Sequence, residues 1–64
     1  DDDARKIIEY MEKNNGEIGY TDKARPEIIK KDFGMSKNEF KRAIGRLLKE
    51  RRVIIKENSI NLIK

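Results

Sequence analysis

The segment Ser36–Arg52 constrains the fold of this chain more than any other part of the sequence. It opens with Ser36, a residue type that caps helices, and Glu39 three positions later completes a capping box. Met35 before the cap and Phe40 after it are spaced as a hydrophobic staple. Apolar residues then recur at the spacing of one buried helical face: Phe40, Ala43, Ile44, Leu47 and Leu48. The sequence therefore predicts one amphipathic helix over the whole segment.

Positive charge is concentrated in the same segment. It has seven Lys or Arg residues and two Asp or Glu residues, a net charge of +5, in a chain whose formal net charge is +4. On a helical wheel, the side opposite the apolar stripe holds a polar and basic set flanked by two further cations: Asn38, Arg42, Gly45 and Lys49, with Lys41 and Arg46 beside them. Such a face suits phosphates, and Asn can pair with a base edge. Because 44% of the chain is charged, a plain solvated face is the alternative.

Upstream, the sequence predicts one helix followed by a short strand. The helix spans Asp3–Asn14 and stops at the helix-terminating run Asn14-Asn15-Gly16. Its apolar stripe is formed at helical spacing by Ala4, Ile7, Ile8 and Met11. Ile18 and Tyr20 then alternate with small or polar residues, which predicts an extended segment over residues 17–21. Both side chains are expected on one face, in the core.

A second, shorter helix is predicted between this strand and Ser36. Pro26 suits a first helical position, and Gly34 suits the left-handed residue that ends a helix. Its buried side is expected to comprise Ile28, Ile29 and Phe33. The short connection Phe33–Ser36 contains a glycine, as does the turn of a helix-turn-helix.

The last residues predict a β-hairpin. Val53–Ile63 reads as two strands around a turn at Glu57–Ser59, where Asn58 can adopt a positive φ. The element order is then α-β-α-α-β-β: an α+β fold of the small winged helix-turn-helix type, with three helices and a carboxyl-terminal hairpin wing. We expect one monomeric domain over residues 1–64. Residues 1–3 read either as the end of a linker or as an acidic first helical turn, which the helix dipole favours.

Composition narrows the classes of function. The chain has no Cys and no His, so the usual general base and two common nucleophiles are missing, and we expect no enzyme. No EF-hand spacing is present, and no metal or other cofactor is expected. The longest apolar run, Val53–Ile55, is far too short to span a membrane, and no signal-peptide pattern is present. A cytoplasmic protein is the resulting expectation.

Several short motifs resemble the carboxyl-terminal domain of the conserved virulence factor B (CvfB/YitL) family. They are Thr21-Asp22-Lys23, Pro26-Glu27, Ile29-Lys30, Phe33-Gly34-Met35-Ser36-Lys37, Phe40-Lys41 and Ala43-Ile44-Gly45. The resemblance covers roughly residues 7–64. It implies the terminal winged helix of a bacterial multidomain RNA-binding protein, with upstream OB-fold domains of the ribosomal protein S-one type and a role in virulence-factor expression. Where a Leu-Tyr-Lys run is expected from the family, this chain has Leu47-Leu48-Lys49, which removes a potential stacking ring.

Three functions remain open from the sequence. The leading one is accessory RNA binding, single-stranded RNA above all, beside upstream domains of the same protein. The alternatives are a DNA-binding domain of a transcription regulator and a winged helix that binds a protein. The candidate nucleic-acid-binding residues are Asn38, Lys41, Arg42, Arg46, Lys49 and, at the wing, Lys56. Arg51 and Arg52 are expected at the helix end, where they either contact a ligand or interact with the helix dipole.

Overall fold

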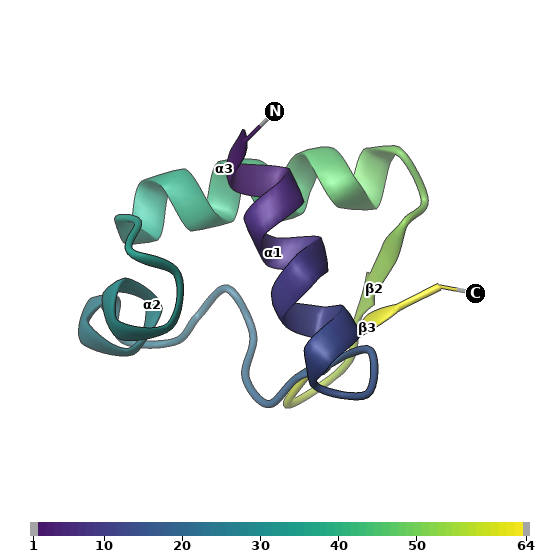
Figure 1. Cartoon of the computed structure of the whole chain (residues 1–64), viewed down its shortest axis with the longest axis horizontal. Coiled ribbons are helices and arrows are strands. Elements are labelled where there is room, and N and C mark those ends of the chain that lie inside the picture. The colour runs from purple at the N-terminus through teal and green to yellow at the C-terminus, as the bar shows by residue number, and fades with distance from the viewer. Residues whose placement is uncertain (1, 64) are drawn as a thin grey trace.

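The computed structural model describes residues 2–63. Within them, three helices and three short strands follow one another in the order that the sequence predicts: α1 (Asp2–Lys13), β1 (Glu17–Ile18), α2 (Pro26–Phe33), α3 (Lys37–Lys49), β2 (Val53–Ile55) and β3 (Ile60–Leu62). Figure 1 shows α3 along one side of the molecule, α1 crossing it, and the hairpin leading away from its carboxyl-terminal end. The predicted α+β winged-helix fold is confirmed.

The sheet is antiparallel, with β3 as its central strand in the order β1-β3-β2. Ile18 pairs with Ile60, and Val53 pairs with Leu62. Because side chains alternate along a strand, this register places five apolar residues on the inner face. Ile18, Val53 and Ile60 are buried there, and Ile55 and Leu62 are partly buried against the core. The wing therefore closes the core beside α1 and α3, and its inner face is fixed by packing.

The core lies between the three helices and the sheet. Phe40 is fully buried, and its ring centroid lies 5.2 Å from that of Phe33 and 6.3 Å from that of Tyr20. Tyr10 extends this aromatic group, with its centroid 4.7 Å from that of Phe33. Aliphatic side chains complete the core: Ala4, Ile7, Met11, Ile29, Ala43, Ile44 and Leu47. Opposite this core, α3 faces solvent.

The end of α3 differs from the prediction. The helix ends at Lys49 rather than Arg52, because Arg51 adopts a left-handed conformation with φ of 58°. The Arg51 N–H donates to the Leu48 carbonyl at 3.0 Å, and the Arg52 N–H donates to the Leu47 carbonyl at 2.9 Å. These two bonds form a Schellman motif, which usually requires glycine where Arg51 stands. The two arginines therefore belong to a turn, and the prediction that they end the helix is wrong.

Arg51→Gly is expected to stabilise the domain by about 0.5–1 kcal/mol. The left-handed conformation costs a non-glycine residue about 1–2 kcal/mol, and the extra unfolded-state entropy of glycine offsets part of that gain. A thermal melt should show a midpoint a few degrees higher. Arg51→Ala is the control, since it removes the same charge without relieving the backbone. A gain from Arg51→Ala as large as that from Arg51→Gly would contradict this interpretation.

Smaller differences concern the earlier elements. The first helix begins at Asp2 and ends at Lys13, so Asp2 and Asp3 form its acidic first turn; Asp1 lies outside the described residues. The strand covers only Glu17–Ile18, and Tyr20 lies in the bend that follows, half-buried against the core. Ile28 is 42% exposed rather than buried, because α2 turns its Ile29 and Phe33 edge inward.

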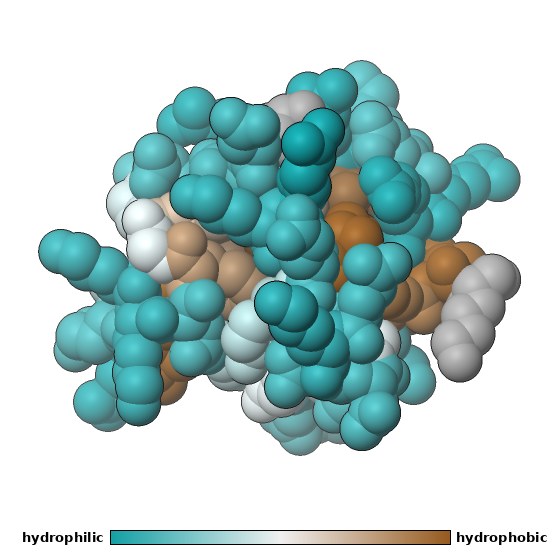
Figure 2. Space-filling view, in the orientation of Figure 1, coloured by the Kyte–Doolittle hydropathy of each residue, from teal (hydrophilic) through white to brown (hydrophobic). Residues whose placement is uncertain are grey.

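Most of the surface in view is hydrophilic. Figure 2 shows hydrophilic side chains over most of this face, with apolar surface near the end of β3 and between α1 and the hairpin. No helix within residues 2–63 is both long enough and apolar enough to cross a membrane.

Candidate nucleic-acid interface

The start of α3 is fixed by its predicted cap. The Glu39 N–H donates to the Ser36 hydroxyl at 3.1 Å, and the Ser36 N–H donates to a Glu39 carboxylate oxygen at 2.7 Å. These hydrogen bonds lower the pKa of Glu39. Met35, next to the cap, is buried. Together the cap and the buried stripe fix how α3 is rotated about its axis, and hence which side chains face solvent.

Four of the six candidate residues share the solvent face of α3. Asn38, Lys41, Arg42 and Lys49 are all exposed. These residues are separated by three, four and seven positions in the sequence, which places them along one side of a helix. That side is opposite the buried Phe40, Ile44 and Leu47. We call this surface, together with Gly45, the basic face of α3. It offers three cations and one amide to a ligand.

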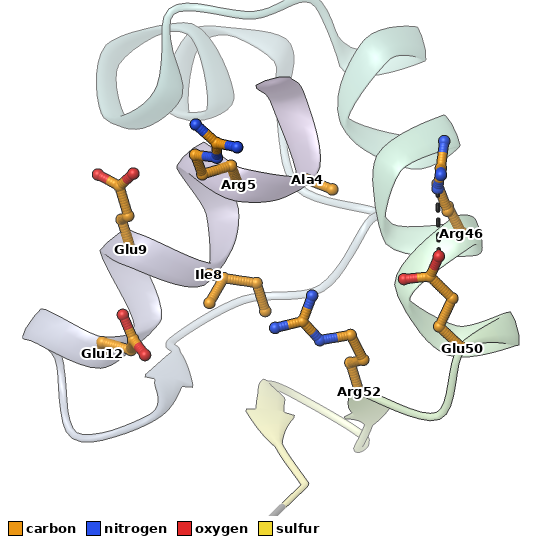
Figure 3. Close-up of a pocket in the computed structure, with 8 residues that line it drawn as sticks. All are labelled: Ala4, Arg5, Ile8, Glu9, Glu12, Arg46, Glu50 and Arg52. Carbon is orange, nitrogen blue, oxygen red and sulfur yellow. Dashed lines mark hydrogen bonds and ion pairs between the residues drawn. The ribbon is translucent and has the colours of Figure 1, made fainter. Parts of the chain in front are cut away.

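Arg46 lies at the edge of this face. Its Nε lies 3.3 Å from a carboxylate oxygen of Glu50, with both side chains about half exposed. It also lines a hollow of about 420 Å³ between α1 and the end of α3. Figure 3 shows Arg46 beside Glu50, whereas Arg52 extends from the turn toward Ile8 on α1. Arg46 is therefore set apart from the four residues of the basic face.

Lys56 lies away from the basic face. It is exposed and stands in the connection between β2 and β3, where its N–H donates to the Ser59 carbonyl at 2.7 Å. In Figure 1, this connection lies on the opposite side of the molecule from α3. Side chains of the hairpin turn and of the loop before α2, among them Asn58 and Lys23, line a shared hollow. The structure therefore does not bring Lys56 together with the candidates on α3.

The acidic residues of α3 and its cap flank the basic face and do not lie within it. Glu39 serves the capping box, and Glu50 pairs with Arg46 in the hollow beside α1. Helical spacing places both of them more than a quarter turn from Gly45. Glu39 nevertheless lies three positions from Arg42, and after the capping-box hydrogen bonds the charge of Arg42 also contributes to lowering the pKa of Glu39. Within α3 the basic face therefore has one carboxylate at its Arg42 edge, and its excess of positive charge can attract an anionic ligand.

Leu48 is a surface residue that the sequence interpretation placed in the apolar stripe. It is 38% exposed, and it borders the basic face on the side of Lys41. The only signal in the sequence was its position at the edge of the stripe, which does not separate burial from exposure. An exposed apolar side chain beside cations is a feature that a nucleic-acid strand can contact through its sugars and bases.

Comparisons with known proteins place this chain in a family. A family model described as a CvfB-like winged helix domain matches residues 5–62. Conserved virulence factor B of Staphylococcus aureus (strain MW2) is 44% identical over 64 residues, which are 100% of this chain and 21% of that protein. The protein of the same name from Staphylococcus saprophyticus is 44% identical over 62 residues, 97% of this chain and 21% of that protein. The chain thus spans about a fifth of these relatives, in their carboxyl-terminal part.

A solved structure shows the same fold. A crystal structure of a multidomain protein with nucleic acid binding domains from Streptococcus pneumoniae is similar to this chain, with a TM-score of 0.93 and 38% sequence identity. The match covers 98% of this chain and 22% of that one. Sequence motifs, architecture and relatives agree, and this chain therefore belongs to the family of CvfB-like winged helix domains.

Proposed function

We propose that this domain is an accessory RNA-binding module that holds single-stranded RNA along the basic face of α3. The observation that carries the proposal is the separation of charge on that helix. Lys41, Arg42 and Lys49 share one exposed face with Asn38, while Glu39 is held at the edge of this face by the capping box and Glu50 pairs with Arg46. Cations arranged in this way neutralise phosphates and release counterions, which is the main source of non-specific affinity for nucleic acid. The multidomain relative with nucleic acid binding domains supports the same class of ligand.

The proposed role is binding rather than catalysis, in the cytoplasm, as part of a longer protein. No His or Cys is available as a general base or thiol nucleophile. The chain has two Tyr and two Phe; both Phe side chains are buried, so electrostatic contacts to the strand backbone dominate. With three or four such contacts, we expect an affinity of about 10⁻⁴–10⁻⁶ M. Upstream RNA-binding domains would raise it through effective concentration, and virulence regulation would follow from the RNA bound.

The test removes the three cations of the basic face together. In the triple variant Lys41→Gln, Arg42→Gln and Lys49→Gln, binding of a labelled single-stranded RNA is measured by fluorescence anisotropy at several salt concentrations. Each lost phosphate contact should lower the slope of log K against log salt by about 0.7. We therefore expect the slope to fall by about 2, with an unchanged circular dichroism spectrum and melt.

A matched control separates a local contact from net charge. The triple variant Lys13→Gln, Lys23→Gln and Lys31→Gln removes the same number of charges from exposed positions outside α3. It should keep most of the salt slope and affinity of the parent. Equal losses in the two triple variants would contradict a defined interface on α3. Tighter, sequence-selective binding of duplex DNA than of RNA would instead favour the transcription-regulator alternative.

A further inference from the structure

Gly45 stands in the middle of α3, whereas the other glycines of the chain lie in turns and loops. Glycine inside a helix lowers stability relative to alanine, so its presence calls for a reason. Apart from its chain neighbours and the nearby backbone of α3 itself, a Cβ atom built at Gly45 would meet no atom within 4 Å. Its φ is not in the left-handed region either, unlike those of Gly16 and Gly34. Neither packing nor backbone conformation within this domain explains the missing side chain.

The neighbours of Gly45 on the helix surface are the residues three and four positions away. On the amino-terminal side these are Lys41 and Arg42, and on the carboxyl-terminal side Leu48 and Lys49. All four are exposed, Leu48 to 38%. Because position 45 has no side chain, the backbone of α3 is left uncovered there between three cations and one apolar side chain, and we call this gap the depression. None of its four neighbours is acidic.

We infer that Gly45 is the seat of a phosphodiester group of the bound strand, in direct contact with the backbone of α3. The phosphate oxygens accept hydrogen bonds from Lys41, Arg42 and Lys49, and the adjoining sugar or base packs on Leu48. A side chain at position 45 would hold the phosphate away from the helix and weaken contact with all three cations at once. This inference rests on the proposed function, and it adds the place where the strand lies on α3.

The test fills the depression without changing the charge. Gly45→Gln adds a long neutral side chain whose helix propensity exceeds that of glycine, so the fold should be kept. Affinity for the labelled single-stranded RNA should fall about tenfold, the effect of losing one charge-assisted hydrogen bond. Gly19→Gln is the matched control, because a Cβ at Gly19 also meets nothing within 4 Å and this glycine lies outside α3. The control should bind as the parent does.

A gain-of-affinity variant tests the rim of the same depression. Leu48→Tyr places an aromatic ring beside the proposed phosphate seat, where a base can stack on it. Base–aromatic stacking should tighten binding about fivefold or more, and Leu48→Ala should weaken it. An affinity for Leu48→Tyr equal to that of Leu48→Ala would overturn the placement of the strand.

The outcomes separate this inference from the proposed function. A loss of binding in the Lys41, Arg42 and Lys49 triple variant, with none in Gly45→Gln, would overturn the phosphate seat and leave the proposed function standing. No loss in either variant would overturn both. Equal losses in Gly45→Gln and Gly19→Gln would also overturn the seat, because the effect would then not depend on α3.

Discussion

Replacing Phe40 with alanine is expected to lower the free energy of unfolding by about 3–5 kcal/mol. Phe40 is fully buried, and its ring packs against those of Phe33 and Tyr20. The substitution removes these contacts and leaves a cavity between α3, α2 and the loop before α2. A domain of this size has a stability of about 3–10 kcal/mol, so the loss is a large fraction of the total and the variant should melt far below the parent. Circular dichroism during urea or thermal unfolding measures the loss.

The matched control for this prediction is Ile28→Ala. Ile28 is 42% exposed, so its truncation leaves no enclosed cavity and should change the stability by well under 1 kcal/mol. A cooperative melt of Phe40→Ala within a few degrees of the parent would contradict the assignment of Phe40 to the centre of the core. Where Phe40→Ala loses RNA binding, the loss is expected to follow from destabilisation of the fold, because Phe40 is fully buried and has no exposed surface with which to touch a ligand.

The parts of the fold that depend on local chemistry were predictable. The capping box of Ser36 and Glu39, the left-handed Gly34 and the stop at Asn15-Gly16 all appear where the sequence predicts them. Each is specified within a few residues, by a side chain that bonds a nearby N–H or by a residue that tolerates positive φ. The end of α3 was not predictable in this way. Its left-handed residue is Arg51, which gives no compositional signal.

The candidate site was predictable only in part, for a related reason. Helical periodicity alone places Asn38, Arg42 and Lys49 opposite the buried stripe. Whether Arg46 and Lys56 lie beside these residues depends on where α1 and the hairpin pack. A helical wheel gives no information about that packing. The exposure of Leu48 likewise depends on how far the neighbouring elements extend over the edge of α3. Gly45 was visible in the sequence, but only the empty space around it excludes a packing role.

One tertiary feature that the sequence did not predict is a hydrogen-bonded group of two tyrosines and one carboxylate. The Tyr20 hydroxyl donates to a carboxylate oxygen of Asp32 at 2.6 Å, and the Tyr10 hydroxyl lies 3.5 Å from the same oxygen. The group joins α1, the loop before α2 and α2 itself, at the edge of the aromatic core. Burial first, then the charge and hydrogen bond of Asp32, raise the pKa of Tyr10. For Tyr20, burial is again the largest cause, and its pKa is raised far above 10.

These shifts predict a domain that loses stability in alkaline solution. An unfolded tyrosine loses its proton near pH 10, whereas folded Tyr20 keeps its proton to higher pH. The unfolded state therefore binds fewer protons above pH 10, and stability falls as the pH rises. The contribution is fully present below about pH 10 and is lost as the pH rises through the raised pKa. The loss from Tyr20 is at most about 1.4 kcal/mol per pH unit, and solvent screening at this half-buried site reduces it.

The variant Tyr20→Phe isolates this effect from the titration of lysines in the same pH range. At neutral pH it should cost about 1 kcal/mol, because one hydrogen bond is lost and Asp32 keeps only the longer contact with Tyr10. Between about pH 9.5 and 11.5, urea unfolding should show a shallower decline in stability than in the parent, so that the two curves converge. Parallel curves over that range would show that the Tyr20 hydroxyl titrates alike in the folded and unfolded chains. The bond to Asp32 would then contribute nothing to the alkaline limit of the fold.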